Sequence, residues 1–295
     1  MLHDSVLYHG RWPAVLFLPL LVCAAASGQP ARCTQETIVG TYAAKSQGFI
    51  SMIPPGASQP VAVPIASLSL GSLDDKGNVA AHGYISVGGQ VQSVSDFEGK
   101  VKVNSDCTAV MQGPGTTFDL VIHDEGATME GLVAQFPVGK PIGIGTWKRI
   151  SRIPSTVDPK QCSEASLHGV YAFNADGIFI VSLPDHTTTP APFAVNGYNS
   201  IGYDGKVTAT GAGSLGGQTG SVQITGNVSV QPDCSGTGTF SLAYLGQTSS
   251  LQDWFVVLDG GNEVWIMMTE ASGMQPIALE TWTRNSPIPL TQTQQ

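Results

Sequence analysis

The sequence predicts an all-β fold in which two tandem domains each form an eight-stranded up-and-down antiparallel β-barrel, with β-sandwiches as the alternative. Short segments rich in Val, Ile, Thr and aromatic residues alternate with turns of Gly, Asp, Asn and Pro along the chain. No stretch after the N-terminal segment keeps the 3.6-residue period of an amphipathic helix. Three sequence blocks recur in the same order, which indicates a duplicated domain.

The duplication has a period close to the size of a small domain. The repeated blocks are residues 33–43 and 162–172, residues 99–107 and 226–234, and residues 141–149 and 276–284. Their offsets are 129, 127 and 135 residues, so eight extra residues lie between Cys234 and Pro276. This period is too long for a solenoid repeat. We therefore expect one domain over 29–150, a linker at 151–161, a second domain over 162–285 and a mobile tail at 286–295.

Each strand of the first domain is expected between two turn signals. The turns fall at 74–78, 88–89, 104–106 and 124–126. The expected strands cover 38–52, 61–73, 79–87, 90–104, 107–112, 117–123, 128–136 and 141–149. The second domain repeats the pattern, with turns at 204–205, 216–217, 232–233 and 259–261. Eight strands in a barrel leave an interior that is filled by side chains or holds one small ligand.

Residues 1–28 are typical of a secretory signal peptide. Arg11 precedes an uncharged run from Trp12 to Ala26, which is fifteen residues long. A membrane-spanning helix needs roughly 20 apolar residues. Small residues near 26–28 suit cleavage by a signal peptidase. We therefore expect a secreted, periplasmic or cell-surface protein with no stable membrane insertion after cleavage.

Four cysteines remain after this cleavage, and an even number in an exported protein favours disulfides. In an up-and-down barrel, the start of the first strand and the turn after the fourth strand lie at the same end. Cys33 and Cys107 occupy these two places in the first domain, and Cys162 and Cys234 occupy them in the second. Four cysteines allow three pairings, of which the repeat symmetry favours 33–107 with 162–234.

The opposite end of each barrel carries the longer connections. They include two Pro-rich segments and the eight-residue expansion near Gly246. Variable loops at one end of a rigid barrel often bind ligands, although such loops are also tolerated as plain surface insertions. The candidate ligand-binding residues are Pro54, Pro55, Asp185, His186 and Gln247.

Two sequence patterns resemble those of known exported proteins. The run Cys-Ser-x-x-Ser-Leu-x-Gly-x-Tyr-x-Phe at 162–173 and the block Val-x-Val-x-x-Asp-Cys-x-Gly-Thr at 228–237 resemble a group of uncharacterised exported repeat proteins of soil bacteria. This resemblance implies export and a β-rich fold, and it implies no activity. Residues 33–42 and 146–147 are also similar to the first and last strands of avidin-like and lipocalin-like barrels. That similarity implies architecture only, because no ligand-contact pattern matches.

Charge and motifs exclude several functions. Thirteen Lys and Arg residues against 22 Asp and Glu give a net charge of −9, which argues against a nucleic-acid partner and against docking on an anionic membrane. Residues 211–216 fit G-x-G-x-x-G and place Ser214 in a loose nucleophile-elbow pattern, but no helix is expected after them. His123, Asp124 and Glu125 are adjacent, so their side chains seldom converge on a metal ion. We predict no catalytic residue, no metal site and no cofactor.

The leading functional hypothesis is non-enzymatic binding of a small apolar ligand, a glycan or a cell-surface component. One alternative is a cyclase-type or isomerase-type enzyme that uses a barrel cavity. Another is a structural module of an envelope or matrix. The barrel interior distinguishes them, because an enzyme needs ionisable groups in a cavity, a binding module needs a cavity without them, and a structural module needs neither.

Overall fold

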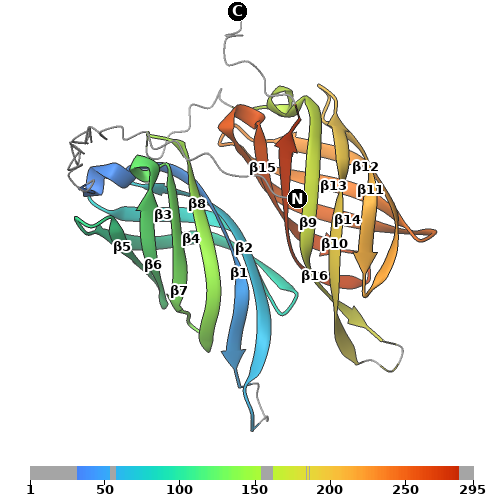
Figure 1. Cartoon of the computed structure of the whole chain (residues 1–295), viewed down its shortest axis with the longest axis horizontal. Coiled ribbons are helices and arrows are strands. Elements are labelled where there is room, and N and C mark those ends of the chain that lie inside the picture. Colours follow the sequence, from blue (N-terminus) through green and yellow to red (C-terminus); the bar gives the residue numbers. More distant parts are fainter. Residues whose placement is uncertain (1–31, 54–57, 154–161, 184, 186, 286–295) are drawn as a thin grey trace, which may run out of the picture. The chain divides into compact units, whose positions relative to one another are not determined.

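The computed structural model describes residues 32–53, 58–153, 162–183, 185 and 187–285. It shows two closed eight-stranded antiparallel barrels (Figure 1), coloured blue to green and yellow to red. Helical structure in the described residues is limited to short 3₁₀ turns. The fold class expected from the sequence is confirmed, and the β-sandwich alternative is wrong. The expected signal peptide at 1–28 and the expected tail at 286–295 lie outside the described residues.

Strands that follow one another in sequence are neighbours in each barrel, and the first strand closes with the last. Barrel 1 consists of β1 (Gly40–Met52), β2 (Val61–Leu73), β3 (Asn78–Val87), β4 (Gln90–Val103), β5 (Thr108–Gly113), β6 (Thr116–His123), β7 (Thr128–Gln135) and β8 (Lys140–Ser151). Barrel 2 consists of β9 (Gly169–Ser182), β10 (Thr188–Ile201), β11 (Lys206–Leu215), β12 (Gln218–Val230), β13 (Ser235–Tyr244), β14 (Gln247–Leu258), β15 (Glu263–Ala271) and β16 (Met274–Arg284).

One end of each barrel is sealed in the same way. Disulfides join Cys33 to Cys107 and Cys162 to Cys234, as the repeat symmetry predicted. The linked N-terminal segments form the 3₁₀ turns η1 (Gln35–Ile38) and η3 (Glu164–Leu167), and the last residue of each turn is fully buried. These segments therefore close the barrel ends as hydrophobic plugs.

An arginine near the end of the last strand secures each plug. Arg284 donates hydrogen bonds to the carbonyl oxygens of Ser166, His168 and Gly261. The Tyr171 hydroxyl donates to the same Gly261 carbonyl at 2.7 Å. Because this tyrosine is buried, its pKa is raised to about 12. Arg149 and Tyr42 repeat the arrangement in barrel 1, so carbonyls that the 3₁₀ turns leave free are satisfied at both ends.

The eight extra residues of the second domain do not form a loop. Strands β5 and β6 have six and eight residues, whereas β13 and β14 have ten and twelve. The β13–β14 turn consists of Leu245 and Gly246, both with positive φ, as a tight hairpin turn requires. The expectation of a variable loop near Gly246 was therefore wrong, since the insertion adds four residues to each strand.

The two barrels belong to one compact unit of the chain and pack against each other through their outer walls. Leu68 and Leu70 on β2 share one hydrophobic cluster with Trp254 on β14 and with Trp265 and Met267 on β15. The Lys148 ammonium, on β8, lies 2.6 Å from Asp259 and 2.5 Å from Glu263. No helix in the described part of the chain is long and apolar enough to span a membrane.

Candidate functional site

Barrel 1 is hollow. Its interior holds a cavity of about 280 Å³. All eight strands of the barrel contribute to the lining of this cavity, which includes Ala44, Ile65, Leu73, Val79, Ile85, Val94, Met111, Phe118, Val133 and Trp147. An apolar cavity of roughly 150 Å³ is already enough to bind benzene. The barrel 1 cavity can therefore hold a larger apolar group, such as a bicyclic ring or a short alkyl chain.

The lining residues of the barrel 1 cavity carry no charge. Its polar groups are few, and the hydroxyls of Ser46, Ser67 and Tyr42 are hydrogen-bonded within the protein. The Ser46 and Ser67 hydroxyls, on adjacent strands, are hydrogen-bonded to each other at 2.7 Å. The Tyr42 hydroxyl donates to the Gly126 carbonyl at 2.7 Å, and burial raises the pKa of this tyrosine. The cavity thus offers shape and apolar surface rather than acid–base groups.

The contrast with barrel 2 shows how the cavity arises. Ala44 pairs with Trp147 in barrel 1, and Phe173 pairs with Trp282 in barrel 2. Ala44 and Phe173 therefore occupy equivalent positions in the two barrels. The phenyl ring of Phe173 is buried in the barrel 2 core, whereas Ala44 leaves that volume empty. The missing ring is a direct reason why one barrel is hollow and the other is filled.

Two further matched positions follow the same rule. In barrel 1 the tyrosine Tyr42 pairs with Gly71, whereas in barrel 2 the equivalent Tyr171 pairs with Asn199. Ser46 pairs with Gly145 in barrel 1, and the equivalent Ala175 pairs with Glu280 in barrel 2. Gly145 therefore corresponds to Glu280. At these positions barrel 1 has glycine and barrel 2 has a polar side chain, which adds to the difference in filling.

In the described part of barrel 2, a small space of about 20 Å³ lies beside Asn199, Asp253 and Glu280. Such a volume is enough for roughly one water molecule. Burial raises the pKa of Asp253, with a further contribution from the Glu280 charge, and burial raises the pKa of Glu280 to about 7. The Trp282 indole N–H donates to the Glu280 carboxylate. This carboxyl pair lacks the room for a substrate.

Exposed apolar side chains gather on two adjoining hairpins of barrel 1 away from its sealed end. Ile142 and Ile144 on β8 are 71% and 63% exposed. Phe49 on β1 lies opposite Ile142, and Leu132 on β7 lies opposite Ile144; both are exposed. Exposed apolar patches of this kind often accompany binding sites.

Of the predicted ligand-binding residues, the two that the structure describes, Asp185 and Gln247, do not line the barrel 1 cavity. Pro54, Pro55 and His186 lie outside the described residues. The carboxylate of Asp185 accepts hydrogen bonds from the backbone and hydroxyl of Thr187, which lowers its pKa. Gln247 is an exposed residue at the start of β14. These residues remain predictions without a site in the structure.

The sequence analysis missed the residues that define the two interiors. The sequence analysis did not recognise the buried Asp253 or the half-buried Glu280, although each stands two residues from buried apolar residues on the same face of its strand. The comparison of Ala44 with Phe173 was available from the aligned repeats, since both stand two residues after the shared tyrosine. Trp147 and Trp282, which occupy matched positions in the two repeats, pack in the barrel cores.

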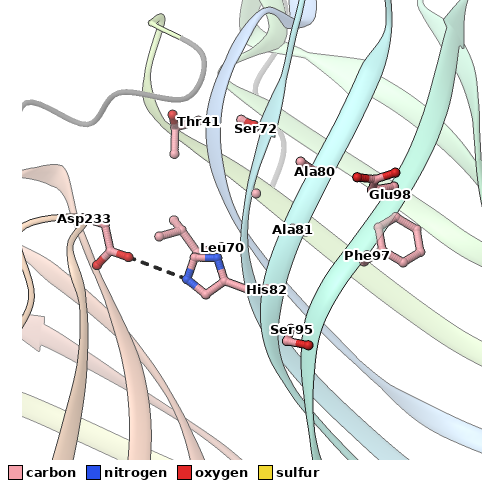
Figure 2. A pocket seen from close by; sticks show the side chains of 11 residues that line it. Thr41, Leu70, Ser72, Ala80, Ala81, His82, Ser95, Phe97, Glu98 and Asp233 are labelled. Atoms are coloured by element: carbon pink, nitrogen blue, oxygen red, sulfur yellow. Dashed lines mark ion pairs between the residues drawn. The ribbon is translucent and has the colours of Figure 1, made fainter.

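A second hollow, of about 370 Å³, lies on the outer side of barrel 1 (Figure 2). There His82 on β3 points toward Asp233, and Nε2 of His82 lies 3.6 Å from the Asp233 carboxylate. Hydrogen bonds from His82 and from Ser235 lower the pKa of Asp233 to about 2. Since this ion pair joins the two barrels, we treat it as a structural contact.

Comparisons with known proteins add little to this picture. No protein-family model and no curated protein matches the chain. A Nitrosomonas europaea structure provisionally described as AttH is 11% identical, with 90% of this chain and 99% of that chain covered and a TM-score of 0.26. A mutant of transferrin binding protein B from Haemophilus parasuis Hp5 is 6% identical, with coverages of 83% and 76% and a TM-score of 0.30. TM-scores this low support no conclusion about the function of this chain.

Proposed function

We propose that the chain is an exported, non-enzymatic binding protein whose barrel 1 holds a small apolar ligand. The observation that carries this proposal is the cavity of about 280 Å³, lined by uncharged and mostly apolar side chains. Burial of apolar ligand surface is worth roughly 25 cal/mol per Å², and the rigid barrel limits the entropy cost of binding.

Export is supported by the disulfides in both barrels, because such bonds persist in oxidising compartments. The proposed location is extracellular, periplasmic or on the cell surface, after removal of residues 1–28. N-terminal sequencing of exported material should then begin between about Ser27 and Ala31. Intact Met1 in a membrane fraction would contradict cleavage.

The enzyme alternative is not favoured by the described geometry. Barrel 1 has the space, but the residues that line its cavity carry no charge. Barrel 2 has the carboxyl pair of Asp253 and Glu280, but only about 20 Å³ of space. Within the two barrel interiors, space and acid–base groups therefore occur in different barrels.

The proposal is tested with N-phenyl-1-naphthylamine, a neutral apolar dye that fluoresces strongly when it leaves water. The full-length protein should bind the dye with saturation. Ala44→Phe restores the ring that Phe173 supplies in barrel 2, so it should weaken dye binding by roughly tenfold or more while the barrel stays folded. Native mass spectrometry of the purified protein should also detect a copurified apolar molecule.

Ala134→Phe is the matched control, because Ala134 lies on the exposed outer face of barrel 1. It adds the same ring outside the cavity and should leave dye binding unchanged. Equal binding by wild type and Ala44→Phe, with both proteins folded by circular dichroism, would refute the barrel 1 site.

A further inference from the structure

The outer wall of barrel 2 formed by β9–β13 is nearly free of charge. These five strands contain only two charged residues, Asp176 and Lys206, in a chain with a net charge of −9. Outward positions carry mainly Thr, Ser, Asn and Gln, which are exposed. Such a surface can form many hydrogen bonds with a neutral partner but offers little to a charged one.

A shallow groove of about 740 Å³ crosses this wall from β9 to β12. Its lining includes small residues, such as Ala194, Ala212 and Gly213, and one carboxylate, Asp176. Asn174 and Asn196 lie directly opposite each other on β9 and β10 and line the groove together. Each amide has both donors and an acceptor, which suits the neighbouring hydroxyl groups of a sugar.

Tyr198 adds an aromatic ring on the same face of β10, two residues beyond Asn196. The side chain of Tyr198 is 60% exposed, and its cross-strand neighbours are the smaller Ala172 and Thr210. The corresponding residue of barrel 1 is Leu70, which is buried against barrel 2. The wall that barrel 1 uses for packing is thus uncovered in barrel 2 and carries an exposed tyrosine there.

We propose that this groove binds a neutral oligosaccharide. One sugar ring stacks on Tyr198, and the amides of Asn174 and Asn196 bind its hydroxyl groups. An aromatic ring supplies a flat apolar face with a polar tip, and amide groups supply paired hydrogen bonds. Asp176 is the one charged residue that lines the groove, and its carboxylate disfavours an acidic polysaccharide. The site is separate from the barrel 1 cavity.

The test is affinity electrophoresis of the full-length protein in native gels that contain dextran, galactomannan, hydroxyethylcellulose or xyloglucan. At least one of these neutral polymers should retard the wild-type protein. Tyr198→Ala and Asn196→Ala should each weaken this retardation by roughly tenfold. Ala44→Phe should leave it unchanged, so failure of the barrel 1 proposal and failure of this one are distinguishable.

Tyr203→Ala is the matched control. Tyr203 lies in the β10–β11 turn and is also exposed, but it is not on the wall beside Asn196, and its ring stacks on that of His168 with 3.6 Å between the ring centroids. Its loss should not change the retardation. The proposal is overturned if none of the four polymers retards the wild type, if Tyr198→Ala migrates like the wild type, or if alginate, an acidic polymer, is bound better than every neutral one.

Discussion

Glu280 lies in the wall of barrel 2 where the repeat counterpart in barrel 1 is Gly145. Burial keeps its carboxyl group protonated to a higher pH than in the unfolded chain, with a pKa of about 7 instead of 4.5. Asp253, which is also buried, shifts in the same direction. The side chains that fill barrel 2 therefore make its stability depend on pH, whereas those that line the barrel 1 cavity carry no charge.

The sign of this dependence follows from proton binding. Below pH 4.5 both the folded and unfolded states hold the Glu280 proton, so burial of this group costs least there. As the pH rises from 4.5 to 7, the unfolded chain loses the proton first, and the free energy of unfolding falls by about 3 kcal/mol. We expect a higher melting temperature at pH 5 than at pH 8.

Glu280→Gln keeps an acceptor for the Trp282 indole and removes the ionisable group. Calorimetry of this variant at pH 5 and pH 8 should show a smaller difference in melting temperature than for the wild type, and the remaining difference comes from Asp253. A pH difference equal to that of the wild type would show that Glu280 is ionised in the folded barrel, contrary to the prediction.

At the scale of elements, sequence alternation and turn residues predicted the strands well. The expected segment 61–73 coincides with β2, and 90–104 matches β4 within one residue. The hairpin β13–β14 was misjudged, because Gly246-Gln247-Thr248 is equally suited to a loop and to a tight turn followed by a strand. Only the pairing partners in β12 and β15 decide between the two.

The disulfide of each barrel is predicted to stabilise that barrel alone. In the loop-entropy view, a bond across 74 residues contributes about 4 kcal/mol. Cys107→Ser should lower the unfolding free energy of barrel 1 by a few kcal/mol and leave barrel 2 nearly unchanged. Hydrogen exchange followed barrel by barrel would measure this. The matched variant Cys234→Ser should give the reverse pattern. If either variant lowered the unfolding free energy of both barrels equally, the disulfides would not stabilise the barrels independently.

At the scale of the whole molecule, two barrels of common origin have different interiors and share one interface. That interface buries Trp254 and Trp265, which are 6% and 3% exposed. The Lys45 ammonium lies 4.5 Å from the centre of the Trp265 ring. The sequence offered no signal for this contact, because an outward-facing tryptophan on a strand has the same pattern whether it meets solvent or a second domain.

Separate fragments test how far the barrels depend on each other. Residues 32–153 and 162–285 each contain a closed strand ladder and a disulfide, so each should fold alone under oxidising conditions. The barrel 2 fragment exposes Trp254 and Trp265, so its tryptophan emission should shift to longer wavelength than that of the whole chain. Adding the barrel 1 fragment should reverse part of the shift. Two unfolded fragments would mean that neither barrel is autonomous.

The short β5–β6 hairpin has a kinetic consequence for barrel 1. Only Lys100–Val103 of β4 pair with β5, whereas nine residues of β12 pair with β13. The earlier part of β4 is held by β3 on one side alone in this ladder, so its amides should exchange with solvent through small local openings. In barrel 2 the amides of β12 that pair with β13 should exchange only with larger unfolding events. A ligand inside barrel 1 would then dissociate at a rate set by local opening between β4 and β5, however stable the rest of the protein is.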